Sequence, residues 1–126
     1  MRQLEITTGA YDRPYVTNGI YEDTPARLYI KWKQRHGGDE RDSFYEIILD
    51  KETGAATVHR SGEYTSELVF DTGKKTEGVI NTPYGAITTP IITHYINLPS
   101  LLSPKFEISY EMGADKIKNL FMVKLL

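Results

Sequence analysis

Three histidines and several carboxylates are the residues of this chain that could do acid–base chemistry. His36, His59 and His94 lie far apart in the sequence, and no two of them have the short spacing of a metal-binding motif. A histidine held beside a carboxylate can act as a general base. His59 or His94, paired with Glu63 or Glu107, would therefore form the catalytic pair of a hydrolase or isomerase.

A second possible catalytic signal is Phe70-Asp71-Thr72-Gly73, because Asp-Thr-Gly after apolar residues is the catalytic loop of aspartic proteases. That chemistry needs two carboxylates that share one proton in an uncharged, buried site. Lys74 and Lys75 follow directly, where such proteases have a small residue and an apolar strand. We therefore interpret the segment as a hairpin turn, which Asp and Gly favour.

The composition excludes several classes of partner and cofactor. With 126 residues, 40% hydrophobic and 25% charged, the chain is expected to form a single globular domain over residues 1–126. Lys and Arg number 15 against 17 Asp and Glu, so we expect no nucleic-acid partner and no membrane partner. Cysteine is absent, which excludes disulfides and thiolate chemistry, and we expect no metal and no cofactor. The sequence shows no signal peptide or membrane-spanning run, so we expect a cytoplasmic protein.

Runs of β-branched and aromatic residues, broken at short intervals by Gly, Pro, Asn or Asp, predict strands. In residues 27–33, Leu28, Ile30 and Trp32 fall on one face and the residues between them on the other. Strands are predicted over residues 27–33, 43–49, 56–60, 64–70, 76–81, 86–97, 105–111 and 116–126, and residues 4–8 and 17–22 are further candidates. We expect about eight strands in total.

Hairpin-length links join these strands, and no helix of about ten residues is expected. A chain of short neighbouring strands avoids exposed edges by closing on itself. The sequence therefore predicts an all-β fold, an antiparallel up-and-down β-barrel, with a β-sandwich as the alternative. Pro90 cannot donate a hydrogen bond to a neighbouring strand, and so predicts an edge, a kink or a bulge at its position.

Several short motifs, taken in order, resemble one known family. They are His59-Arg60-Ser61-Gly62-Glu63, Leu68-Val69-Phe70-Asp71-Thr72-Gly73, Asn81-Thr82-Pro83-Tyr84-Gly85, Thr93, Ile108-Ser109-Tyr110 and Asn119. Together they resemble the small uncharacterised YwiB-like family of Gram-positive bacteria, over most of the chain from about Gly19 onward. The resemblance implies a lipocalin-like (calycin) β-barrel. It implies no activity and supplies no catalytic residues.

By analogy of fold, a lipocalin-like barrel is expected to bind a small apolar or amphipathic ligand at its mouth, without catalysis. The residues expected to bind it are Arg60, Tyr84, Tyr110 and Trp32. The planar guanidinium of Arg60 suits a carboxylate or phosphate, and the three aromatic side chains would form walls. In the alternative interpretation, Arg60 stacks on an aromatic ring at the barrel end and Tyr84 packs. A hydrolase or isomerase and a structural or partner-binding barrel remain open as functions.

The predicted C-terminal strand is apolar on both faces. One face carries Phe121, Val123 and Leu125, and the other carries Leu120, Met122 and Leu126. A barrel strand needs only one apolar face, and an exposed apolar patch usually marks an interface. We therefore expect a homodimer through this strand. The alternative is that the segment Tyr11-Asp12-Arg13-Pro14-Tyr15 covers it within one chain.

Overall fold

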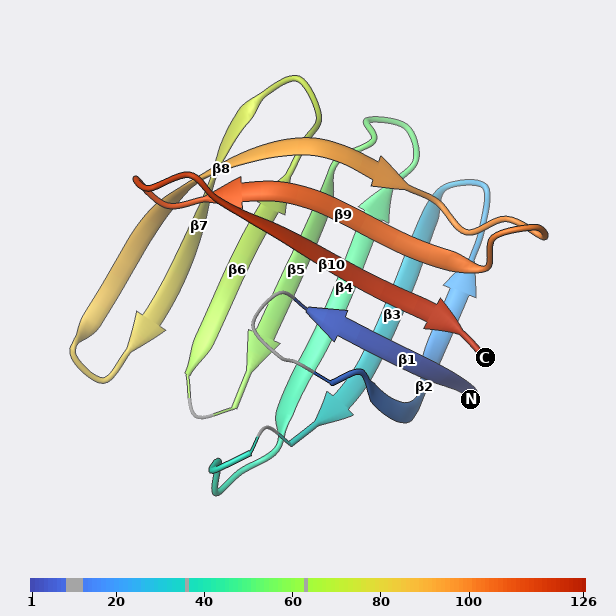
Figure 1. The fold of residues 1–126 in the computed structure, drawn as a ribbon, viewed down its shortest axis with the longest axis horizontal. Coiled ribbons are helices and arrows are strands. Elements are labelled where there is room, and N and C mark those ends of the chain that lie inside the picture. Colours follow the sequence, from blue (N-terminus) through green and yellow to red (C-terminus); the bar gives the residue numbers. More distant parts are fainter. Residues whose placement is uncertain (9–12, 36, 63) are drawn as a thin grey trace.

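The computed structural model describes residues 1–8, 13–35, 37–62 and 64–126, and ten antiparallel strands in this part form one closed barrel (Figure 1). The strands are β1 (Arg2–Thr8), β2 (Tyr15–Asp23), β3 (Arg27–Gln34), β4 (Ser43–Asp50), β5 (Ala56–Ser61), β6 (Thr65–Phe70), β7 (Lys75–Thr82), β8 (Gly85–Asn97), β9 (Lys105–Met112) and β10 (Ile117–Leu125). Each strand pairs with its neighbours in sequence, and β1 also pairs with β10. In the described residues, no helix is long and apolar enough to cross a membrane.

The predicted all-β, antiparallel up-and-down barrel is confirmed. It has ten strands rather than about eight, because both N-terminal candidates form complete strands. β1 fills the gap between β2 and β10, with Leu4 opposite Thr17 on one side and Leu125 on the other. Closure in this way leaves β1 and β10 hydrogen-bonded along both edges.

The turns between strands use the residues that the sequence suggested. Gly54, with φ of 81°, ends the β4–β5 turn, and its amide donates to the carbonyl of Asp50 at 2.7 Å. The Asp71-Thr72-Gly73 segment is a turn between β6 and β7, in which Gly73 has φ of 83°. Its interpretation as a turn rather than a protease loop is confirmed. In both turns, glycine adopts a left-handed conformation that other residues rarely take.

The barrel is flattened into two layers whose strands cross (Figure 1). One layer contains β2 to β7, and the other contains β9, β10 and β1. β8 belongs to both layers, because it pairs with β7 from Gly85 and with β9 only from Ile91 onward. Pro90 stands directly before that second pairing begins, and it has no amide that could donate to β9. The register shift lies a few residues further on, between Thr93 and Tyr95.

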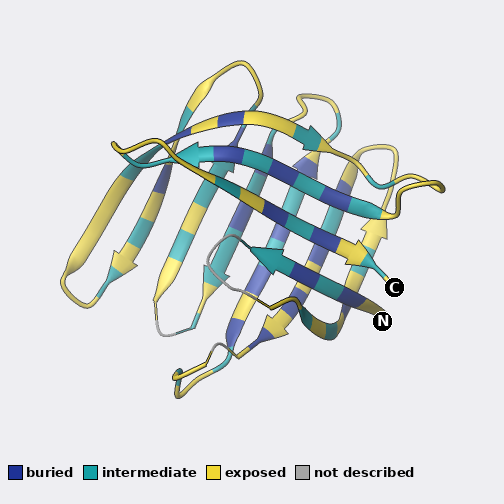
Figure 2. Cartoon of the chain, viewed as in Figure 1, coloured by how far each residue is buried: buried dark blue, intermediate teal, exposed yellow. Residues whose placement is uncertain are grey.

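Buried residues alternate with more exposed ones along several strands, β3, β4 and β9 most clearly (Figure 2). Leu28, Ile30 and Trp32 of β3 all face the interior, as predicted. The interior is filled by one connected hydrophobic cluster, made of Leu4, Ile6, Leu28, Ile30, Trp32, Tyr45, Ile47, Leu49, Ala56, Val58, Phe70, Ile91, Phe106, Ile108, Tyr110, Phe121 and Val123. Burial of this apolar surface is the main driving force for forming the barrel.

β10 places its two apolar faces in different surroundings. Phe121 and Val123 are buried in the core, whereas Leu120 and Met122 lie on the outside. Met122 stands between Thr7 of β1 and Glu107 of β9. The outer face of β10 therefore mixes apolar and polar residues. Residues 9–12, part of the segment proposed as an intramolecular cover, lie outside the described residues.

Candidate functional site

A row of inward-facing side chains crosses one end of the barrel, from β3 to β8. Its members are successive cross-strand partners, namely Trp32, Tyr45, Arg60, Ser66, Ile80 and Ile87. Exposure increases along the row, from 3% at Trp32 to 55% at Ile87. The reason is that β9 pairs with β8 only beyond Pro90, so the end of the β7–β8 hairpin projects past the second layer (Figures 1 and 2). The row therefore leads from the buried core to a solvent-exposed end of the barrel, which we call the mouth.

Arg60 is the charged member of this row, and four side chains hold it. Its guanidinium lies 4.2 Å from the ring centre of Tyr64 and 5.5 Å from that of Tyr45. Nη2 donates to Ser43 Oγ at 3.1 Å, and Nη1 donates to the hydroxyl of Tyr64. The carboxylate of Asp39 is 3.9 Å from Nη2, which is an ion-pair distance but too long for a hydrogen bond. These contacts fix the plane of the guanidinium at the end of the barrel.

One nitrogen of the Arg60 guanidinium has no hydrogen-bond partner within the described part of the chain. This atom is Nε, and it is buried. The side chain is only 12% exposed, so water screens its charge weakly. A buried N–H without an acceptor is unfavourable, and more so when the group is charged. An oxygen of a bound anion would accept a hydrogen bond from this Nε. Its negative charge would also add to that of Asp39, 3.9 Å away, in balancing the charge of Arg60.

Local backbone geometry places Ser43 beside Arg60. β5 alternates strictly, so Ala56, Val58 and Arg60 all point inward. Gly62 follows β5 with φ of 148°, and a Cβ there would lie 3.1 Å from Ser43 Oγ. The glycine thus allows β5 to end close against the start of β4, where Ser43 accepts its hydrogen bond.

The structure brings together two of the four residues predicted to bind a ligand. Trp32 stacks on Tyr45 with ring centres 5.0 Å apart, and Tyr45 in turn contacts Arg60. Tyr110 instead packs edge-on against Phe70 in the core at 4.8 Å, and burial raises the pKa of its hydroxyl. Tyr84 is 99% exposed in the turn between β7 and β8. These last two stand apart from the group around Arg60.

Sequence reasoning did not identify Ser43, Tyr45 and Tyr64 as neighbours of Arg60. A signal was present, since β3, β4 and β5 were predicted as consecutive hairpins and alternation places Ser43 and Tyr45 on the apolar face of β4. The missing information was the register between the strands, which pairs Tyr45 with Arg60.

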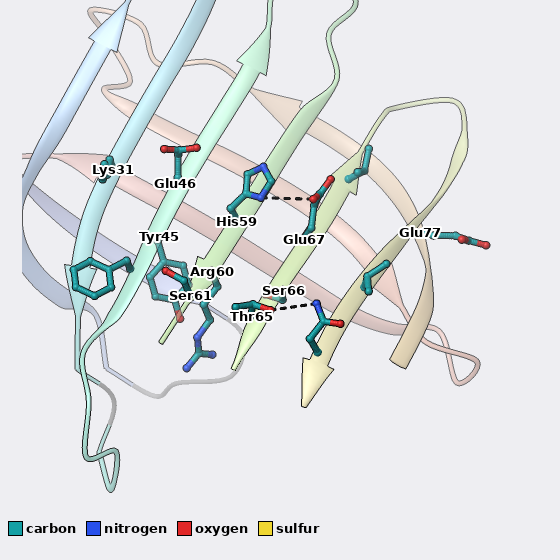
Figure 3. A pocket seen from close by; sticks show the side chains of 14 residues that line it. Lys31, Tyr45, Glu46, His59, Arg60, Ser61, Thr65, Ser66, Glu67 and Glu77 are labelled. Carbon is teal, nitrogen blue, oxygen red and sulfur yellow. Dashed lines mark hydrogen bonds and ion pairs between the residues drawn. The ribbon is translucent and has the colours of Figure 1, made fainter. Parts of the chain in front are cut away.

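A shallow groove of about 900 Å³ lies on the outer face of the same strands, lined by residues of β3 to β7, and three members of the inward-facing row, Arg60 among them, also border it (Figure 3). Lys31, Glu46, His59 and Glu67 are successive cross-strand partners along it. Nδ1 of His59 is 3.7 Å from a carboxylate oxygen of Glu67. Both side chains are well exposed, and the distance exceeds that of a hydrogen bond. This histidine is therefore not held as an oriented base.

The other candidate acid–base pairs also differ from the prediction. His94 lies at the register shift of β8 and approaches Glu111, with Nε2 3.3 Å from the carboxylate. Glu107 pairs instead with Lys105 at 3.4 Å. Glu63 lies outside the described residues. Within the described part of the chain, no three histidine or carboxylate side chains gather as they would around a metal ion.

Comparison with known proteins adds a family and a related fold. The family model described as "Domain of unknown function (DUF1934)" matches residues 7–120. The crystal structure of the YwiB protein from Bacillus subtilis is similar over 96% of this chain and 86% of that chain, with a TM-score of 0.67 and 19% sequence identity. At this identity, the likeness supports the fold alone. No curated protein matches the chain.

Proposed function

This chain belongs to the DUF1934 family of unknown function, and we propose that its barrel binds a small amphipathic anion at the open end beside Arg60. The resemblance to YwiB-like proteins expected from the sequence is confirmed by the family match and by the similar fold. Neither comparison assigns an activity, so the proposal rests on the geometry of the mouth.

The buried Nε of Arg60, which has no hydrogen-bond partner among the described residues, is the observation that carries the proposal. Ser43 and Tyr64 already orient the guanidinium, so binding an anion would cost little further side-chain entropy. Arg presents parallel N–H groups that match the oxygens of a carboxylate or a phosphate. The rings of Tyr45 and Tyr64 would flank the anionic group.

The apolar part of the ligand would follow the inward-facing row toward the open end. From Arg60 on β5, the row continues through Ser66 and Ile80 to Ile87 on β8. Three interstrand spacings of about 4.8 Å separate Arg60 from Ile87, which corresponds to about 14 Å. A carboxylate or phosphate head joined to an apolar chain of that length fits both ends of the row.

The proposed activity is binding without catalysis, in a cytoplasmic protein, by analogy with lipocalin-like barrels that take one small ligand at the mouth. In the outer groove around His59, Lys31 lies beside the opposite charge of Glu46, and the carboxylate of Glu67 is well exposed. Arg60 also lines this groove, but its guanidinium is held by Ser43 and Tyr64 and is mostly buried. We therefore place the ligand on the inner side of the sheet rather than in this groove.

The proposal can be tested by titrating the protein with dodecyl phosphate below its micelle concentration. Calorimetry and the fluorescence of Trp32 measure the binding. Inorganic phosphate and dodecanol serve as probes of the head and the chain alone. We expect dodecyl phosphate to bind most tightly. Arg60→Met keeps the apolar stem but removes the charge, and should weaken binding of dodecyl phosphate at least tenfold, equivalent to about 1.4 kcal/mol.

Two matched variants control for general effects. Arg35→Met removes an exposed arginine that pairs with Asp42, and His59→Ala alters the outer groove. Both should bind dodecyl phosphate as the unmodified protein does. The proposal would be refuted if the unmodified protein bound none of the three probes, or if Arg60→Met bound dodecyl phosphate with unchanged affinity.

A further inference from the structure

The end of the β7–β8 hairpin is an uncharged, exposed projection. Residues 78–89 contain no charged side chain, although 25% of the whole chain is charged. The segment includes Tyr84, Ile87 and Val79, all exposed to solvent. Protein interfaces are depleted in charged residues and enriched in aromatic ones. The composition and exposure of this hairpin are therefore those of a contact surface. They do not depend on the proposed ligand, although Ile87 is also the last member of the inward-facing row.

One edge of this projection has no partner strand among the residues that the structure describes. Residues 85–89 of β8 pair with β7 on one side, and the pairing of β8 with β9 begins only at Ile91. Elsewhere in the described barrel, both edges of β1 and β10 are paired. An unpaired edge offers free N–H and C=O groups to another strand, and proteins usually block it with charged residues or proline. In β8, Pro90 blocks only the position that follows the free edge of residues 85–89.

The register shows which backbone groups are free. Thr82 and Gly85 flank a two-residue turn, so they form a hydrogen-bonded pair, and the next such pair is Ile80 with Ile87. The N–H and C=O groups of Ala86 and Thr88 must then point away from β7. The carbonyl of Pro90, which follows the same alternation, does accept a hydrogen bond on that side, from the amide of Gly113 at 3.0 Å.

We propose that a second copy of this chain pairs with the free edge of β8, antiparallel across a two-fold axis near Ile87. A two-fold axis perpendicular to the strands reverses their direction, so two identical edge strands that it relates are antiparallel. Like charges placed opposite each other destabilise such a pair, and this segment carries none. Ala86 of one copy would then hydrogen-bond with Thr88 of the other. The two Ile87 side chains would face each other as a non-hydrogen-bonded pair.

Light scattering after size exclusion tests the pairing, with Thr88→Pro as the variant and Thr88→Val as its control. Proline removes the N–H at position 88 that points away from β7, and it removes no hydrogen bond between β8 and β7. Valine keeps that N–H. The unmodified protein and Thr88→Val should have twice the monomer mass of 14.4 kDa. Thr88→Pro should have the monomer mass, or a dissociation constant at least tenfold higher, with an unchanged circular dichroism spectrum.

A cysteine cross-link gives a second test that does not depend on the folding of the proline variant. The chain has no cysteine, so Ile87→Cys introduces a single thiol. The Cα atoms of a non-hydrogen-bonded antiparallel pair lie about 4.5 Å apart, within the range for a disulfide. Mild oxidation should therefore link two Ile87→Cys chains quantitatively, whereas Thr72→Cys, in an exposed turn, should remain largely monomeric on a non-reducing gel.

Two results would overturn the inference. The first is a monomer mass for the unmodified protein at its highest soluble concentration, which would leave the edge to a partner of another kind. The second is a folded Thr88→Pro protein that remains a dimer. If that dimer were lost in Met122→Lys, the contact would be assigned to the C-terminal strand predicted from the sequence. If Thr88→Pro is a monomer that still binds dodecyl phosphate, the dimer and the proposed ligand site are separate features, so either can fail without the other.

Discussion

Replacing Leu4 by alanine tests whether β1 closes the barrel. Leu4 is fully buried and lies opposite Thr17 of β2 and Leu125 of β10. Its Cδ1 atom fits against Gly19 so closely that a Cβ on this glycine would lie only 2.7 Å from it. Leu4 therefore fills a space between two backbones, and the neighbouring strands are held by hydrogen bonds to their own partners.

The cost of Leu4→Ala follows from this packing. Leucine-to-alanine changes in cores cost about 2.7–5.0 kcal/mol, and most where the surroundings cannot collapse into the cavity. Because Gly19 offers no side chain that could move into the space, we expect a loss of about 3–4 kcal/mol in the free energy of unfolding. In a domain of this size, 1 kcal/mol lowers the melting temperature by about 3–5 °C, so the expected decrease is roughly 10–20 °C.

Urea denaturation, followed by the fluorescence of the single tryptophan, measures this loss. Trp32 is buried and stacked on Tyr45, so its emission should shift when the barrel opens. Gln3→Ala is the control, because Gln3 is exposed on the same strand and should change stability by less than about 0.5 kcal/mol. Equal stability of Leu4→Ala and Gln3→Ala would refute closure by β1. Most of β1 precedes residues 7–120, so this experiment examines a part of the barrel that the family match does not cover.

Three further predictions concern titration, turns and the outer face. Burial raises the pKa of Tyr110 above 10.0, so its contribution to stability is complete below pH 10 and is lost as the pH rises through the folded-state pKa; Tyr110→Phe should flatten this decline in urea titrations at increasing pH. Gly54→Ala should destabilise the protein by about 1 kcal/mol in thermal melts, because Gly54 has φ of 81°. Met122→Lys should change the free energy of unfolding by less than about 0.5 kcal/mol, since the new amine would reach Glu107 on the outer face; a loss of several kcal/mol would indicate that this face is buried.

The sequence by itself determined the class of fold and the identity of most strands. Alternation is a local property with a period of two, so Leu28, Ile30 and Trp32 could be assigned to one face without knowing their partners. Turns are equally local. Asp and Gly favour them wherever they occur between strands, which is why Asp71-Thr72-Gly73 could be separated from a catalytic loop.

Only the tertiary structure decided which side chains meet. Arg60 was a candidate from its motif, but its neighbours Ser43, Tyr45 and Tyr64 come from other strands or turns, and the register that joins them depends on loop lengths. The carboxylate partners of the histidines also depend on register. At the register shift in β8, His94 lies beside Glu111 rather than beside the predicted Glu63 or Glu107.

The free edge of β8 is likewise a property of the closed barrel. Its sequence shows an uncharged β-strand, but not how far the next strand extends along it. That limit follows from the crossing of the two layers near Pro90. Beyond this residue, the edge of β8 that points away from β7 begins to pair with β9. Local propensity determines that a segment is extended, whereas the curvature of the whole sheet determines which backbone groups remain unpaired.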